Sequence, residues 1–380
     1  MELLRKTVSG IMVILLFISM LTLAFNVKPV KSTWTGGTIY IRADGSIEPS
    51  DAPILTYDNI SYYLTDDILS FADGIVIERD NIIVDGMGHK AISWYGEGNG
   101  VSINGRTNVT VRNLQISYFW RGIYAEDSSF ISLYGNNITS NSEAGILMRG
   151  SHNNVVKNYI AHNRWGIEIG GSYNNISDNT MVSNQAGCNL WFSHNNVSRN
   201  IFINDGMLFL YSEDNVVVDN LVNGKPLIYL ENVSNLTVSE EAGQVILIKS
   251  SNITVKDLDL SNTGVGIELW RTSGSKIYKN RISNNSIGID IWGSNNHIFE
   301  NNITNNAFGI LFGYGSLHNK IYKNNIVKNG DPCLYANSGG ISGSRCNDIF
   351  ENYFSENIYG INYFSCNNNI SVTLIAFKIS

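Results

Sequence analysis

The chain has 380 residues, of which 16% are charged, and its formal net charge is −7. It contains no lysine or arginine cluster and no basic stripe, which argues against a nucleic-acid partner. Hydrophobic residues make up 43% of the chain. At about 1.5–3 kcal/mol for each fully buried aliphatic side chain, this is enough to build a large core.

Residues 1–32 are expected to direct export. Arg5 and Lys6 precede an apolar run over residues 8–25, and polar residues follow it. This order is typical of a signal peptide. The run is long for a cleaved segment, so an uncleaved membrane tether through residues 8–25 is the alternative. Either way, the remainder of the chain is expected to be secreted or to lie at the cell surface.

Residues 33–73 do not follow the pattern of the rest of the chain. We interpret them as an N-terminal cap that covers the first open strand edge, because solenoids need such caps. Asp66 and Asp67 lie in this region, where we expect them to be solvated.

From position 74 onward the sequence repeats a block that opens with Gly-Ile and is rich in Asn. Successive copies begin at Gly145, Gly166, Gly187, Gly266, Gly288 and Gly309. A fixed period in the low twenties indicates a solenoid. Apolar and polar residues alternate within each block, which is the period of a β-strand. The sequence therefore predicts an all-β, right-handed parallel β-helix over residues 74–380.

Asparagine recurs at equivalent positions of the blocks, such as Asn158, Asn179 and Asn200. Asn tolerates the left-handed backbone of tight turns. Its amide can also hydrogen-bond to the same position one coil away, which forms a ladder. We expect most of these residues to be architectural.

Two irregularities interrupt the repeat. The block contracts near residues 227–244, and an insertion at residues 328–339 stretches the spacing between Gly309 and the next copy at Gly340. Beyond Ser371 the repeat fails, and the chain stops without a capping segment. That edge is expected to pair with another chain, or the sequence is part of a longer one.

The four cysteines fall into two classes. Cys346 and Cys366 occupy the same position of neighbouring blocks, within disulfide range at the strand spacing, and Cys333 competes for Cys346. Cys188 takes the place of a repeat isoleucine and is expected to be buried and inert.

The repeat Gly-Ile-x-Leu-x-x-Ser-x-Asn-Asn-x-Ile-x-x-Asn-x-Ile resembles that of the NosD-like family. These are periplasmic copper-binding β-helix proteins, and their repeat is also called the carbohydrate-binding and sugar-hydrolysis (CASH) domain. Residues 38–47, 77–89 and 222–230 are similar to archaeal exported members. The resemblance implies the fold and an extracytoplasmic location. It also implies copper as a cofactor, and it does not assign an activity.

Copper ligands are hard to find in this pattern. His152 and His194 share one position of the repeat, but Tyr173 lies between them, so the two imidazoles are about 10 Å apart at the strand spacing. Met148 and Met181 occupy apolar core positions. The sequence therefore assigns no metal ligands.

In the Gly-Ile-x-Leu strand the third and fifth residues point outward, which places Glu168, Gly170 and Trp191 on this face in the earlier copies. In the later copies the same face carries the candidate ligand-binding residues. We expect Glu268 and Asp290 to lie one coil apart, with Trp270 stacked on Trp292 and Arg271 nearby. Exposed indoles flanked by carboxylates suit a sugar ring, so carbohydrate binding is the predicted function. An ordinary solvent-facing ladder of mixed residues is the alternative interpretation of this face.

Three other functions remain open. Glu268 and Asp290, about 5 Å apart, fit the nucleophile and acid of a glycan-cleaving hydrolase, and a lyase is the related possibility. An accessory role in copper-site assembly follows from the resemblance. A structural envelope rod needs no site at all.

Overall fold

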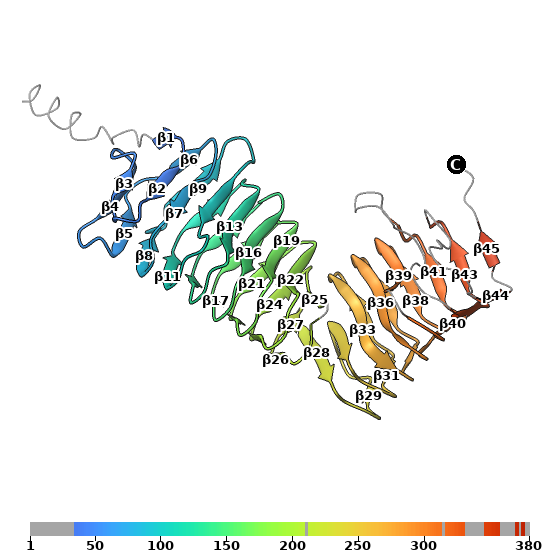
Figure 1. Cartoon of the computed structure of the whole chain (residues 1–380). Coiled ribbons are helices and arrows are strands. Elements are labelled where there is room, and N and C mark those ends of the chain that lie inside the picture. The colour runs from blue at the N-terminus through green and yellow to red at the C-terminus, as the bar shows by residue number, and fades with distance from the viewer. Residues whose placement is uncertain are drawn as a thin grey trace, which may run out of the picture.

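The computed structural model describes residues 34–209, 212–313, 316–330 and 346–357, and the backbone of residues 369–371 and 374–376. All regular elements in these ranges are β-strands (Figure 1). None of the described residues forms a helix that could span a bilayer. The predicted signal segment and most of the predicted insertion lie outside these ranges.

The strands stack in parallel with a spacing of one coil. Ile146 pairs with Ile167, and Ile167 pairs with Cys188, so equivalent positions of successive blocks become neighbours. Their side chains point inward and are fully buried. This arrangement confirms the predicted parallel β-helix.

Residues 34–222, the N-terminal segment, form three sheets. Sheet A contains β1 (Trp34–Gly36), β6 (Ile68–Ser70), β9 (Lys90–Ser93), β12 (Gln115–Ser117), β15 (Asn137–Thr139), β18 (Tyr159–Ala161), β21 (Thr180–Val182), β24 (Ile201–Ile203) and β27 (Leu221–Val222). Sheet B contains β3 (Ile47–Glu48), β2 (Ile39–Ile41), β7 (Ile75–Ile77), β10 (Asn99–Ser102), β13 (Arg121–Glu126), β16 (Ala144–Arg149), β19 (Trp165–Ile169), β22 (Ala186–Leu190) and β25 (Met207–Phe209). Sheet C contains β4 (Ile54–Thr56), β5 (Ser61–Leu64), β8 (Ile82–Asp85), β11 (Val109–Arg112), β14 (Ser132–Tyr134), β17 (Asn154–Val156), β20 (Asn175–Ser177), β23 (Asn196–Ser198) and β26 (Val216–Val218).

Residues 225–376, the C-terminal segment, form two further sheets and extend sheet A, because β27 pairs with the next strand in one 14-stranded sheet. We call this extension sheet D. Sheet D contains β28 (Lys225–Glu231), β30 (Gln244–Ile248), β33 (Val265–Ser273), β36 (Ile287–Ser294) and β39 (Phe308–Phe312). Sheet E contains β29 (Thr237–Val238), β31 (Thr254–Lys256), β34 (Lys276–Tyr278), β37 (His297–Phe299), β40 (Lys320–Tyr322), β42 (Asp348–Phe350) and β44 (Asn369–Ser371). Sheet F contains β32 (Asp259–Ser261), β35 (Arg281–Ser283), β38 (Asn302–Thr304), β41 (Asn325–Val327), β43 (Tyr353–Ser355) and β45 (Leu374–Ala376).

The first strands already belong to the stack. β2, β5 and β6 pair in parallel with β7, β8 and β9, so they form a coil of their own. At the outer edges of sheets B and C, β3 and β4 run antiparallel to their neighbours. This antiparallel pairing covers the edges of these two sheets at the N-terminal end.

A β-hairpin divides the two segments. β27 and β28 pair antiparallel through Asn223 and Gly224, which both have positive φ (52° and 79°), as a tight two-residue hairpin requires. After this turn the Gly-Ile strands no longer add to sheet B. They continue from β28 as sheet D, so the rod changes direction (Figure 1). The contraction near residues 227–244 therefore marks a junction, which the prediction of one uninterrupted stack did not include.

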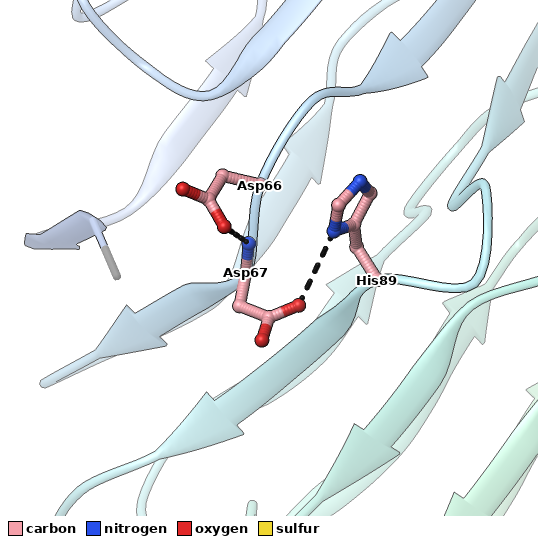
Figure 2. A group of neighbouring side chains, drawn as sticks. All are labelled: Asp66, Asp67 and His89. Atoms are coloured by element: carbon pink, nitrogen blue, oxygen red, sulfur yellow. Dashed lines mark hydrogen bonds and ion pairs between the residues drawn. The ribbon is translucent and has the colours of Figure 1, made fainter. Parts of the chain in front are cut away.

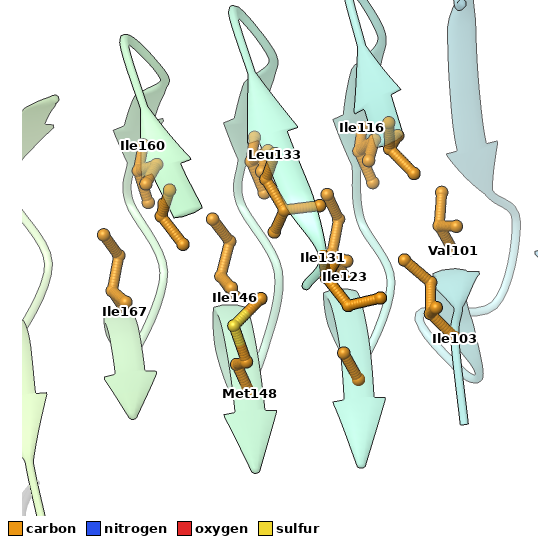
Figure 3. Close-up of a cluster of buried hydrophobic side chains, with 14 of the residues drawn as sticks. Val101, Ile103, Ile116, Ile123, Ile131, Leu133, Ile146, Met148, Ile160 and Ile167 are labelled. Atoms are coloured by element: carbon orange, nitrogen blue, oxygen red, sulfur yellow. The ribbon is translucent and has the colours of Figure 1, made fainter. Parts of the chain in front are cut away.

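The interior of each segment is filled by stacked aliphatic side chains, as Figure 3 shows for part of the N-terminal segment. The predicted asparagine ladders lie at the turns between the strands of each coil. In each coil the Asn amide donates to the amide oxygen of the next coil, as in Asn158 to Asn179 and Asn179 to Asn200, both at 3.0 Å. The prediction that these residues are architectural is confirmed.

Candidate functional site

The predicted contacts on sheet D are present. Glu268 pairs in register with Asp290, and Trp270 pairs with Trp292. The two indole rings lie 5.3 Å apart between centroids, and the Arg271 guanidinium is 5.8 Å from the Trp270 ring. The predicted register is therefore confirmed, but the two rings are tilted by 48° and are not stacked.

The predicted exposure of this face is wrong. Glu268 is fully buried, and only 2% of Asp290 and 6% of Trp270 is accessible to solvent. Trp292 is half-buried, and Arg271 alone is well exposed, where it forms an ion pair with Glu213 at 3.1 Å. In this structure, a polymer in solution cannot reach either carboxylate.

The end of the N-terminal segment covers this face. Ile246, Ile248 and Trp270 belong to the same buried cluster as Met207 and other residues of the first core. A hydrogen bond from the Ser286 hydroxyl to the Gln185 carbonyl (3.0 Å) also links the two segments. The outward face of sheet D is thus an internal interface, because it packs against the end of the N-terminal segment.

Burial changes the chemistry of Asp290. Removal from water raises the pKa of its carboxyl to about 7, and hydrogen bonds from the Trp292 side chain and the Ile291 backbone oppose this shift only in part. Asp290 is therefore an acid held inside a packed interface. The predicted catalytic role of Glu268 and Asp290 has no substrate access in this arrangement.

The equivalent face of the N-terminal segment is open. On the outer side of sheet B lies a groove of about 630 Å³, a volume that is typical of ligand sites. It is lined by Glu126, Asp127, Arg149, Gly150, Ser151, Glu168, Gly170, Gly171, Ser172, Trp191 and Phe192. We call it the sheet B groove.

The groove exists because Gly170 has no side chain. The outward positions at the ends of successive strands hold Glu126, Arg149, Gly170 and Trp191, so Gly170 leaves a gap between a guanidinium and an indole. Trp191 is 38% exposed and Phe192 is 54% exposed. Aromatic faces and charged groups are thus both available from solvent.

Two of the three carboxylates that line the groove, Glu126 and Glu168, are in different electrostatic states. Hydrogen bonds from the Tyr124 hydroxyl and from Arg149 (3.0 Å) lower the pKa of Glu126. Burial, only partly offset by Arg149, raises the pKa of Glu168. Glu126 is therefore more acidic than an ordinary glutamate, and Glu168 is less acidic.

The repeat pattern predicted part of this groove. It placed Glu168, Gly170 and Trp191 on the outward face, and all three line the groove. It missed Glu126 and Arg149. The missed signal is the earlier Gly122-Ile123 copy of the repeat, which stands one block before Gly145 and places Tyr124 and Glu126 on the same face.

The copper ligands that the resemblance implies do not assemble in the described residues. His152 and His194 each stack on Tyr173 with 5.3 Å between ring centroids, so the tyrosine separates them as predicted. Met148 and Met181 are buried in the core, away from these surface histidines. The sulfur ligands that copper(I) prefers are thus not brought together in this part of the chain.

The prediction that Cys188 is buried is confirmed. Burial raises the pKa of its thiol to about 12. Cys346 is exposed and forms no disulfide with another described residue. Cys333 and Cys366 lie outside the described residues, so the disulfide between Cys346 and Cys366 stays a prediction.

Several solved structures have a similar course of the chain. One is the A-module of Azotobacter vinelandii mannuronan C-5 epimerase AlgE6, at 14% identity and a TM-score of 0.31, covering 90% of this chain and 89% of that one. Another is pectate lyase Pel9A, at 16% identity and a TM-score of 0.31, covering 89% and 80%. Similarity this low says nothing about substrate or mechanism. No curated protein matches the chain.

Two family models match the chain. The model of a right-handed β-helix region matches residues 58–203 and 99–241, and the model described as periplasmic copper-binding protein (NosD) matches residues 203–342. Together they span both segments and the junction between them. The repeat, the stacked parallel strands and these two matches lead to one conclusion: the chain belongs to the NosD-like family of right-handed β-helix proteins.

Proposed function

We propose that this protein binds carbohydrate in the sheet B groove, outside the cytoplasm. The observation that carries the proposal is the gap at Gly170, which sets the exposed Trp191 indole opposite Arg149 with Glu168 beside them. The charged N-terminal residues and the apolar run over residues 8–25 support export.

The chemistry of the groove suits a sugar ring. The C–H face of a pyranose packs on an indole, and its hydroxyl groups exchange hydrogen bonds with carboxylates and guanidinium groups. Trp191 and Phe192 supply the apolar surface, while Arg149 and Glu168 supply polar partners. The groove replaces the sheet D face as the proposed binding surface, because only the groove is open to solvent.

A glycan array followed by calorimetry tests this function. Trp191→Ala should weaken the affinity for the bound glycan by about five- to thirtyfold, since one stacked aromatic contributes about 1–2 kcal/mol. Trp94→Ala is the matched control, because Trp94 is also exposed and lies outside the groove. Equal affinities of both variants would reject the groove as the binding site.

Glycan cleavage in the same groove is the second candidate. It is favoured by the opposite pKa shifts of Glu126 and Glu168, because the less acidic of two carboxyl groups is the one suited to protonate a departing glycosidic oxygen. Glu168→Gln should then abolish release of reducing ends or unsaturated products while glycan binding persists. A wild-type protein that binds a glycan without cleaving it would leave binding as the function.

A further inference from the structure

We infer that Asp66, Asp67 and His89 form a zinc site at the N-terminal end of the rod. Asp66 and Asp67 immediately precede β6, and His89 immediately precedes β9 in the next coil (Figure 2). One ligand atom from each side chain lies within 4.8 Å of the other two. This is the one such group of three potential ligands within the described ranges.

Asp66 and His89 occupy the same corner position of successive coils. Lys90 stands in register with Gln115, and Gln115 with Asn137. The preceding corner position therefore holds Asp66 and His89 in the first two coils, Leu114 in the third, and Asn136, Asn158 and Asn179 in later ones. A neutral amide satisfies the backbone of the later coils at this corner. The first two coils instead place a carboxylate and an imidazole there, which are metal-binding groups.

The two adjacent carboxylates at this corner favour the binding of a cation. Asp66 and Asp67 are adjacent, and both are half-buried. No lysine or arginine among the described residues forms an ion pair with either carboxylate. His89 is the one basic side chain that contacts them, with its Nδ1 3.3 Å from the Asp67 Oδ1. Neighbouring carboxylates repel each other, and a bound divalent ion would remove that cost.

The donors fit zinc better than calcium. Zinc takes imidazole nitrogen and carboxylate oxygen at about 2.0–2.2 Å in a tetrahedron, in which two ligand atoms are about 3.3–3.5 Å apart. The separation of 3.3 Å between His89 Nδ1 and Asp67 Oδ1 already has this length. Calcium prefers six or more oxygen ligands and makes no use of an imidazole. With three protein ligands at a half-buried corner, water or another ligand completes the tetrahedron.

Calorimetric titration of the full chain with ZnCl2, after removal of bound metal by chelation, tests the site. Wild type should bind one zinc ion that His89→Gln and Asp67→Asn each weaken by at least about tenfold. His162→Gln is the control for adventitious binding to a surface histidine, and it should leave the affinity unchanged. Unchanged zinc binding in His89→Gln would overturn the assignment.

The change in Tm on adding zinc tests the site even if a substitution lowers the stability of the fold, because each variant is compared with itself. Zinc should raise the Tm of wild type and of His162→Gln, and it should leave the Tm of His89→Gln unchanged, whatever its starting value. A parallel titration with CaCl2 checks the metal. Calcium binding that depends on Asp67 and not on His89 would overturn the zinc assignment. The glycan affinity of the groove is independent of all these outcomes, because the two sites share no residue.

Discussion

The side-chain amide of Gln244 completes the hydrogen bonding of Met207 at the end of sheet B. Its Oε1 accepts the Met207 N–H at 2.9 Å, and its Nε2 donates to the Met207 carbonyl at 2.6 Å. Both residues are fully buried. β25 is the last strand of sheet B, so these two backbone groups have no following strand to pair with. Gln244 thus joins the C-terminal segment to the open end of the N-terminal one.

Gln244→Ala should lower the free energy of unfolding by about 3 kcal/mol, because it leaves two buried backbone groups without partners. Chemical denaturation measures this change. Gln115→Ala is the control, since that amide donates one bond to the Gly88 carbonyl near the surface. Its effect should stay below about 0.5 kcal/mol. Similar losses in the two variants would contradict the role of Gln244.

The buried asparagine ladder should be equally sensitive. Asn179 accepts hydrogen bonds from both nitrogens of Asn158 and donates to Val155 and Asn200. Asn179→Ala should therefore cost about 3–5 kcal/mol of unfolding free energy. Asn154→Ala changes an exposed member of the repeat and should cost about 0.5 kcal/mol or less. Hydrogen exchange of the flanking strands would locate the damage, and undisturbed exchange in Asn179→Ala would argue against a cooperative ladder.

The buried carboxyl of Asp290 predicts a pH dependence of stability. Its folded pKa of about 7 lies above the unfolded value of about 3.9, so the folded state binds the proton more tightly. Stability from this group is complete below about pH 4 and is lost as pH rises through 7, by an amount on the order of 4 kcal/mol.

Asp290→Asn isolates that contribution, because the amide is neutral at every pH. We expect the variant to lose the part of the slope between pH 4 and 7 that comes from Asp290, and to be more stable than wild type at pH 8. Denaturation midpoints across this range provide the measurement. The same slope in wild type and variant would show that Asp290 is not the titrating group.

The sequence predicted the coil and its ladders because both follow from a local period. Positions one repeat apart become neighbours, and that rule correctly paired Trp270 with Trp292. Whether an outward position reaches solvent depends on the path of the whole rod. The turn at Asn223 and Gly224 folds the sheet D face onto the first segment, and no periodicity within one block encodes that contact.

The candidate sites were harder to predict for related reasons. The sheet B groove depends on the missing side chain at Gly170. A glycine carries no functional group, so a sequence pattern does not single it out as part of a site. The zinc corner depends on Asp66 and His89 sharing a position that later coils give to asparagine. Because residues 33–73 are interpreted as a separate cap, Asp66 is not compared with His89 or with the later asparagines. The shared position becomes visible only when the first coils are aligned with the regular ones.

Carbohydrate binding in the sheet B groove is tested most directly by a variant that fills the groove. Gly170 lacks a positive φ, and an added Cβ would lie 3.1 Å from the Arg149 Cγ, so we expect Gly170→Leu to keep the fold after a small shift of the Arg149 side chain. Calorimetry with the glycan that wild type selects on an array should show at least about a tenfold loss of affinity in this variant, with an unchanged Tm. Equal affinity in the filled groove, or no glycan bound by wild type, would contradict carbohydrate binding in the sheet B groove.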